Sequence, residues 1–237
     1  MPPIFIPPNP NSTGDRVTDI DTPDATAAKA KRPITHVLLI VDMSGSMVGL
    51  ADDVRGGFNT YLDGLANADG KYRITATVFD TEFISLCVGA KLKDAPRLTR
   101  GNYMPRGATA LLDAVGKTVA EFDLRVPDLG EADRVLAVVQ TDGQENSSRE
   151  FTAQAIRELI AAREATGKWT FIYLGAGANA WNNGGAMGFA NTVNTAKTRS
   201  GTQSTYAGLS RATSMYAAGA SGADASSVLN DTAGVTP

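Results

Sequence analysis

The sequence contains a single cysteine, Cys87, and a single histidine, His36, among its 237 residues. One cysteine excludes an intrachain disulfide, which fits a reducing compartment. The two residues cannot together build a zinc site of the usual Cys/His type, and each lies in an apolar run typical of a strand. We therefore interpret both as ordinary strand residues, and we expect any bound metal to be a hard cation held by oxygen.

The sequence also lacks an excess of basic charge and any long apolar segment. Its formal net charge is −3, which gives no electrostatic footprint for nucleic acid. No run reaches the ~18 consecutive apolar residues of a membrane span. Residues 1–10 lack the basic start and apolar stretch of a secretory signal. These absences predict a cytoplasmic protein that binds neither nucleic acid nor membrane.

Strand and helix patterns alternate between two tails of biased composition. Residues 1–33 and 219–237 lack periodicity, so we predict an extended or disordered N-terminal arm and a flexible C-terminal tail. In the domain between them, residues 34–218, the patterns predict strands at 35–41, 72–79, 83–88, 135–140, 169–174 and 192–193. They predict helices at 47–65, 111–122, 151–160, just after 179, and 203–217. This alternation predicts an α/β fold, a doubly wound and mostly parallel sheet with helices on both faces and one antiparallel edge strand.

Oxygen-bearing side chains follow the ends of the predicted strands. Ligand sites in such sheets lie at the carboxyl ends of the strands, so the loops after residues 41 and 140 and before residue 111 should meet. These loops supply two carboxylates and three hydroxyls, from Asp42, Ser44, Ser46, Thr109 and Asp142. A hard divalent cation such as Mg²⁺ needs about six oxygens, so this set leaves room for one outside ligand.

Each of these segments also has a plain structural interpretation. Asp42 and Ser44 are suited to capping the helix that follows them, and Thr109 to capping the next one. Thr141-Asp142-Gly143 alone is a common turn. Taken singly, each segment favours the plain interpretation, but their conjunction at strand ends favours a metal site.

These segments resemble the metal-ion-dependent adhesion site of the von Willebrand factor A (vWA) family. Residues 41–47, Val-Asp-Met-Ser-Gly-Ser-Met, are similar to its D-x-S-x-S signature, and residues 107–111 and 141–143 to its second-loop threonine and third-loop aspartate motifs. Further motifs at residues 56–59, 103–107, 142–146 and 171–176 resemble a bacterial cytoplasmic subgroup, and the likeness covers residues 34–218. The loop after Leu174 is richer in glycine than the family pattern.

The resemblance implies a role for each residue of the set. Ser44, Ser46 and Thr109 would coordinate the ion through hydroxyls, and Asp42 and Asp142 directly or through water. The cation would be Mg²⁺, with Mn²⁺ or Ca²⁺ as alternatives, and the open position would accept a carboxylate from a partner protein. Bacterial and phage members often work with AAA+ ATPases, which makes such an ATPase a candidate partner.

We therefore consider three classes of function. The first is a non-enzymatic module that binds an acidic group of a partner through the metal. The second is a structural or accessory component of a larger assembly, such as a phage virion or secretion particle, with the tails as docking arms. The third is an enzyme with the metal as a Lewis acid, for which Glu145 is the one evident general base. We expect no enzymatic activity and no catalytic residues.

Several other motifs are set aside. A haloacid dehalogenase-type phosphatase needs a second aspartate where Ser44 stands, and a P-loop needs a glycine where Leu111 stands. The glycine-rich segment 175–180 lacks the third glycine of a dinucleotide fingerprint. Two open alternatives remain near the site, a second metal site at residues 52–53 and a role for Arg106 in steering an acidic partner.

Overall fold

One sheet forms the frame of the fold. The computed structural model describes residues 32–176 and 180–233. Its strands in these ranges are β1 (Thr35–Asp42), β2 (Tyr72–Phe79), β3 (Phe83–Lys91), β4 (Arg134–Thr141), β5 (Trp169–Ala176) and β6 (Asn191–Thr195). Their order is β3-β2-β1-β4-β5-β6, and all neighbours are parallel except β2 and β3. This confirms the predicted doubly wound, mostly parallel sheet with one antiparallel edge strand.

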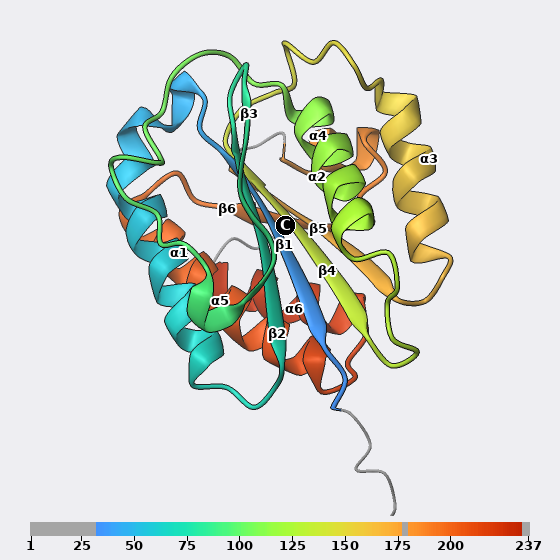
Figure 1. The fold of residues 1–237 in the computed structure, drawn as a ribbon. Helices are drawn as coiled ribbons and strands as arrows, with labels where there is room; N and C mark the ends of the chain where they lie inside the picture. Colours follow the sequence, from blue (N-terminus) through green and yellow to red (C-terminus); the bar gives the residue numbers. More distant parts are fainter. Residues whose placement is uncertain (1–31, 177–179, 234–237) are drawn as a thin grey trace, which may run out of the picture. The chain divides into compact units, whose positions relative to one another are not determined.

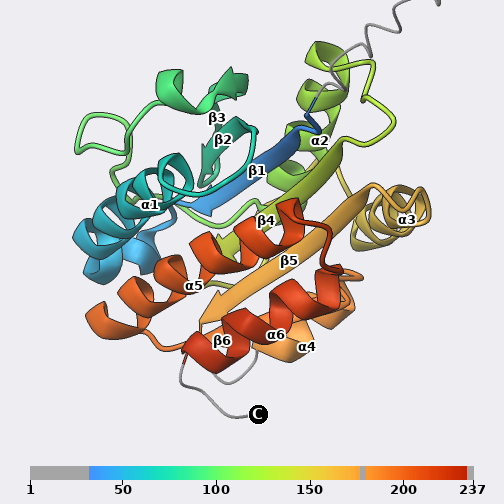
Figure 2. The ribbon, with the colours of Figure 1, turned by 90° about the horizontal axis from the view of Figure 1, so that it is seen from below.

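Helices cover both faces of this sheet (Figures 1 and 2). On one face lie α1 (Ala51–Ala66), α5 (Arg199–Ala217) and α6 (Gly222–Ala233). On the other lie α2 (Leu111–Arg125), α3 (Ala153–Glu164) and α4 (Ala180–Ala186). Two short 3-10 helices, η1 (Gly45–Leu50) and η2 (Leu92–Asp94), sit in the connections. None of the helices in these ranges is both long and apolar enough to cross a bilayer.

The central strand explains why its sequence is an unbroken apolar run. All eight residues of β1 are buried. Val37 and Leu39 pack in the core beneath α1 and α5, and Leu38 and Ile40 pack in the core beneath α2. Because successive side chains point to opposite faces and both faces are covered, every position of the strand can be apolar.

The C-terminal tail predicted over residues 219–237 is wrong for residues 222–233, which form α6. Ala225 and Leu229, one helical turn apart, are fully buried against the core. Two such contacts in a sequence of mostly small and polar residues give only a weak periodic signal, so the pattern alone does not predict a helix here. The arm predicted over residues 1–33 and the end of the tail, residues 234–237, lie outside the described residues except for 32 and 33.

Candidate metal centre

The predicted ligands lie where two neighbouring parallel strands end. Asp42 is the last residue of β1, and Thr141 is the last residue of the adjacent β4. The chain leaves β1 toward α1 on one face of the sheet and leaves β4 toward α3 on the other. Such a divergence opens a crevice at the carboxyl end of the sheet, the usual position of a ligand site in this class of fold.

Asp42 is a buried carboxylate with only neutral partners. Its side chain is 0% exposed, Oδ1 accepts the backbone N–H of Ser44 at 2.7 Å, and Oδ2 accepts the hydroxyl of Thr141 at 2.5 Å. None of the ion pairs in the described part of the chain includes it. Burial raises the pKa of Asp42, although these hydrogen bonds oppose the rise. A buried carboxylate in this environment is stabilised by a cation.

Oxygen atoms from all three loops converge on one small volume. The hydroxyls of Ser44 and Ser46 are 3.0 Å apart, and Ser46 donates to Oδ1 of Asp142 at 2.5 Å. A methyl group placed on Gly143 would lie 3.1 Å from Oγ1 of Thr109, 3.4 Å from Oγ of Ser46 and 3.6 Å from Oδ2 of Asp42. The structure therefore brings together all five side chains singled out in the sequence. Two carboxylates and three hydroxyls are a donor set that suits a hard cation.

The three loops are also tied to one another. The N–H of Gly45 donates to the carbonyl of Gly107 at 3.1 Å, and that of Arg106 donates to the carbonyl of Met43 at 2.8 Å. Between the second and third loops, the N–H of Thr109 donates to Oδ1 of Asn146 at 2.9 Å. The N–H of Asn146 donates back to the carbonyl of Thr109 at 3.1 Å.

The helix-cap alternative for these hydroxyls finds no support. Ala110, not Thr109, is the N-cap residue of α2. No side-chain hydrogen bond caps the start of this helix. Ser44 stands at the N-cap of η1, but its side chain accepts no backbone N–H group of that helix. The hydroxyls of Ser44 and Thr109 are thus not used to cap the helices that follow them.

Two further carboxylates near the site accept hydrogen bonds from backbone N–H groups. Glu145 accepts the N–H groups of Leu112, Ser147 and Ser148 at 2.8 to 2.9 Å. Asp113 accepts three successive N–H groups of residues 149–151 at 2.9 Å. Burial acts to raise the pKa of Asp113, but these N–H groups and Lys117 leave it below its ordinary value. Both carboxylates therefore shape the third loop.

Two side chains that contact the cluster have no role predicted from the sequence. The buried hydroxyl of Tyr103 donates to the backbone carbonyl of Asp42 at 2.7 Å. Nζ of Lys197 lies 2.9 Å from the backbone oxygen of Asp142 and 3.3 Å from its Oδ2. Tyr103 belongs to the 103–107 motif, which gave a signal for it, whereas Lys197 stands in a short polar connection with no pattern.

Arg106 is engaged in ion pairs. Its Nε lies 3.0 Å from Oδ2 of Asp80, and its second guanidinium nitrogen lies 2.5 Å from Oε2 of Glu82. Asp80 is fully buried, so Arg106 supplies its charge partner. The predicted steering role for Arg106 would compete with this pairing.

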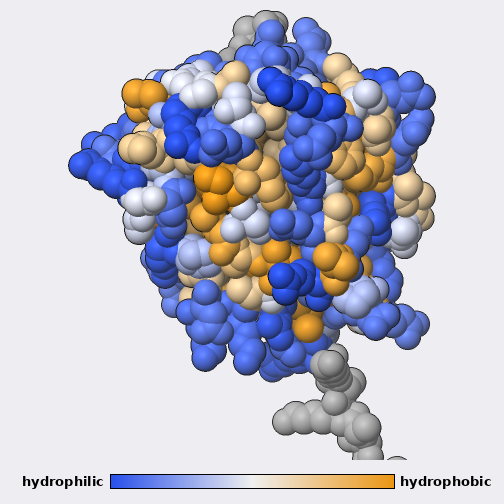
Figure 3. All heavy atoms as spheres, turned by 45° about the horizontal axis from the view of Figure 1, so that its top comes forward, coloured by the Kyte–Doolittle hydropathy of each residue, from blue (hydrophilic) through white to orange (hydrophobic). Residues whose placement is uncertain are grey.

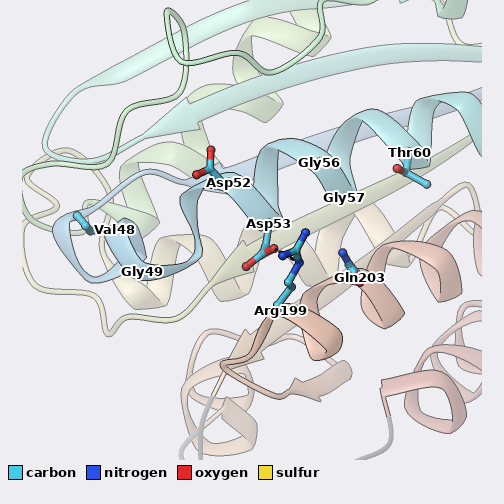
Figure 4. A pocket seen from close by; sticks show the side chains of 9 residues that line it. All are labelled: Val48, Gly49, Asp52, Asp53, Gly56, Gly57, Thr60, Arg199 and Gln203. Atoms are coloured by element: carbon cyan, nitrogen blue, oxygen red, sulfur yellow. Dashed lines mark ion pairs between the residues drawn. The ribbon is translucent and has the colours of Figure 1, made fainter.

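The alternative second metal site at residues 52–53 lies in a groove between α1 and α5 (Figure 4). The groove has a volume of about 670 Å³. Figure 4 shows Asp53 facing Arg199 across it, with 3.4 Å between Oδ1 and Nε. Asp52 pairs with Arg55 at 2.5 Å. Both carboxylates of this alternative site are thus paired with arginines, which gives no support to a second cation there.

Comparison with solved structures places the fold among known ones. PilB minor pilin from Streptococcus sanguinis has a TM-score of 0.59 at 12% identity, over 79% of this chain and 63% of that one. Proximal thread matrix protein 1 from the mussel byssus has a TM-score of 0.53 at 14% identity, over 78% and 46%. A von Willebrand factor type A protein from Catenulispora acidiphila has a TM-score of 0.50 at 16% identity, over 77% and 43%. This chain has a vWA-like fold.

The likeness is one of fold, because the identities are low. No protein-family model matches the sequence, and no curated protein matches it. The chain spans less than two thirds of the length of each of the three structures. The vWA-like sheet nevertheless accounts for the position of the oxygen cluster, since it places the ends of β1 and β4 side by side.

Proposed function

We propose that this vWA-like domain is a metal-dependent protein-binding module. Asp42, Ser44, Ser46, Thr109 and Asp142 hold a divalent cation, and an acidic side chain of a partner protein completes its shell. The observation that carries the proposal is the convergence of these oxygens around a buried carboxylate, Asp42, that no basic side chain neutralises among the described residues.

Mg²⁺ is the cation that this donor set favours. Carboxylate and hydroxyl oxygens are hard ligands, and five of them leave one position of an octahedral shell for an outside group. Mn²⁺ and Ca²⁺ accept the same ligands and are the alternatives. The surface around this end of the sheet mixes apolar with charged side chains (Figure 3), and the exposed Val48 and Met104 lie in the segments that carry Ser46 and Arg106. A mixed surface of this kind suits a protein partner.

Binding is favoured over catalysis because the carboxylates beside the cluster are occupied. Glu145, the one general base that the sequence offered, accepts several backbone N–H groups and the hydroxyl of Ser148. A group used in this way is poorly placed to move a proton. We therefore propose no enzymatic activity, and an AAA+ ATPase of the same cell is the partner class to examine first.

The alternative function, a component of a larger assembly, has less support from the described residues. One of its two proposed docking arms includes α6, whose residues Ala225 and Leu229 are buried within the domain. The other, residues 1–33, lies almost wholly outside the described residues. A virion or secretion particle thus stays a prediction from sequence.

Thermal unfolding with and without metal tests the site directly. A cation at 100 times its Kd stabilises the folded state by about 2.7 kcal/mol. For a domain of this size we expect Mg²⁺ to raise the Tm by about 5–10 °C over the protein in chelator. Asp42→Ala and Thr109→Ala should abolish the rise, and the exposed Asp128→Asn should retain it. A rise of equal size in Asp42→Ala would contradict the proposal.

Partner capture tests the second half of the proposal. The tagged domain is incubated with lysate of the native source in Mg²⁺ or in chelator, and bound proteins are identified by mass spectrometry. We expect a protein that is retained in Mg²⁺ and lost both in chelator and with Asp42→Ala. Equal capture by wild type and Asp42→Ala under both conditions would rule out metal-dependent binding.

A further inference from the structure

Lys197 places a positive charge on one of the proposed metal ligands. Its ammonium nitrogen is 3.3 Å from Oδ2 of Asp142 and 2.9 Å from the backbone oxygen of the same residue. The other carboxylate oxygen of Asp142 accepts the hydroxyl of Ser46. The Asp142 side chain is only 4% exposed, so water has little access to its carboxylate. The two proposed carboxylate ligands thus differ, because no basic side chain in the described part of the chain pairs with Asp42.

The segment that carries Lys197 is held in place by its backbone. Thr198 is the N-cap residue of α5, and its Oγ1 accepts the N–H of Gly201 at 3.1 Å. The N–H of Thr198 donates to the carbonyl of Ala196 at 2.8 Å. Gly201 packs so closely on Ala196 that a Cβ would lie 2.6 Å from the Ala196 oxygen. The backbone at Lys197 is therefore fixed, and its half-exposed side chain is directed from β6–α5 to the third loop.

We infer that Lys197 is a positioning residue that competes with the cation for the Asp142 carboxylate and thereby weakens cation binding. The inference rests on the proposed function, since it concerns the same site. A divalent ion and an ammonium group that share one carboxylate repel each other, and the carboxylate neutralises only part of their joint charge. The ion must therefore either displace Lys197 or bind beside it, and both lower its affinity.

A purely structural role makes a different prediction. An ion pair whose lysine is 48% exposed contributes about 0–1 kcal/mol to stability. If Lys197 only braced the third loop, removing it would loosen the ligands and weaken cation binding. The direction of the change in affinity thus separates the two roles.

The test is a titration of the full chain with Mn²⁺, followed by electron paramagnetic resonance, and with Mg²⁺, followed by calorimetry. Lys197→Met keeps the length of the stem and removes the charge, and we expect its Kd for both ions to fall on the order of tenfold. Lys197→Arg should stay near the wild-type value because the charge is restored. Lys93→Met is the matched control, since Lys93 pairs with Asp94 on η2, and its Kd should not change. Lys197→Gln replaces Lys197→Met if the latter does not fold.

The outcomes separate this inference from the proposed function. If wild type binds Mn²⁺, and Lys197→Met and Lys197→Gln bind it equally or more weakly, the inference is overturned. The proposed metal site is then unaffected. No binding of either ion to wild type or to the variants overturns both.

Discussion

Two adjacent glycines in α1 should respond to alanine in opposite directions. Gly56 and Gly57 both lie in the helix interior, and neither has a positive φ. A Cβ on Gly56 would meet nothing within 4 Å. A Cβ on Gly57 would lie 2.1 Å from Cδ2 and 2.7 Å from Cε2 of Tyr206. The helix propensity changes equally at both positions, so the difference between the variants reports the contact with Tyr206.

The expected magnitudes follow from these contacts. Replacing glycine by alanine in a helix stabilises it by about 0.4–1 kcal/mol where the space is free, as at Gly56. At Gly57 the ring of Tyr206 has to move, yet it is buried and its hydroxyl donates to Oε1 of Gln140. Overpacking of this kind costs about 1–3 kcal/mol, and loss of the hydrogen bond adds about 1 kcal/mol. We expect a net loss of about 2–3 kcal/mol for Gly57→Ala.

Urea unfolding in chelator, followed by circular dichroism, measures both values without any contribution from bound metal. Gly57→Ala combined with Tyr206→Leu should lose less stability than the sum of the two single variants, because the clash is relieved. Equal destabilisation by Gly56→Ala and Gly57→Ala would refute the reasoning, since it would mean that the contact with Tyr206 is not what makes Gly57→Ala unfavourable.

Three further predictions concern stability. Burial lowers the pKa of His36 below its ordinary value of 6.5, so the unfolded state binds the proton more readily. The free energy of unfolding should fall as the pH drops below about 6.5, and His36→Gln should lose part of this dependence in urea titrations at several pH values. Asp113→Asn removes the charge that binds residues 149–151 and should cost about 2 kcal/mol in the same assay, whereas unchanged stability would show those bonds to be unimportant. Leu229→Ala empties a fully buried position and should cost about 3 kcal/mol, and no loss would mean that α6 does not pack on the domain.

The sheet could be predicted because its central strands, β1, β2, β4 and β5, are almost wholly buried. The unbroken apolar run of β1 and the alternation of strands with helices indicate its class, because helices between parallel strands cover both faces of a sheet. The strand predicted over residues 83–88 is the antiparallel edge strand β3, which extends to Lys91. α6 was missed because its stability comes from packing of Ala225 and Leu229 on distant elements, which local periodicity records poorly.

The gathering of the five site residues could be predicted because two loops carry polar residues at the ends of β1 and β4, and a third carries Thr109 just before α2. Their supporting contacts could not be predicted. Asp113 and Glu145 bind backbone N–H groups more than 30 residues away, and Lys197 reaches across 55 residues to Asp142. Such contacts depend on where loops come to rest, and one sequence carries no spacing rule for them. The metal itself and its partner stay predictions.

The bonds that join the three loops have a consequence for how this protein could diversify. Three of them run between main-chain atoms, from Gly45 to Gly107, from Arg106 to Met43 and from Asn146 to Thr109. A main-chain bond involves no side-chain atom, so it survives most substitutions at Met43, Arg106, Thr109 and Asn146, whereas Gly107 has a positive φ and Gly45 lies close to the Gly107 oxygen. Side chains on the rim, such as Val48 and Met104, are therefore free to vary while the ligands keep their places. A lineage could change the partner that it recognises by mutation at the rim alone, with the ion-binding chemistry inherited unaltered.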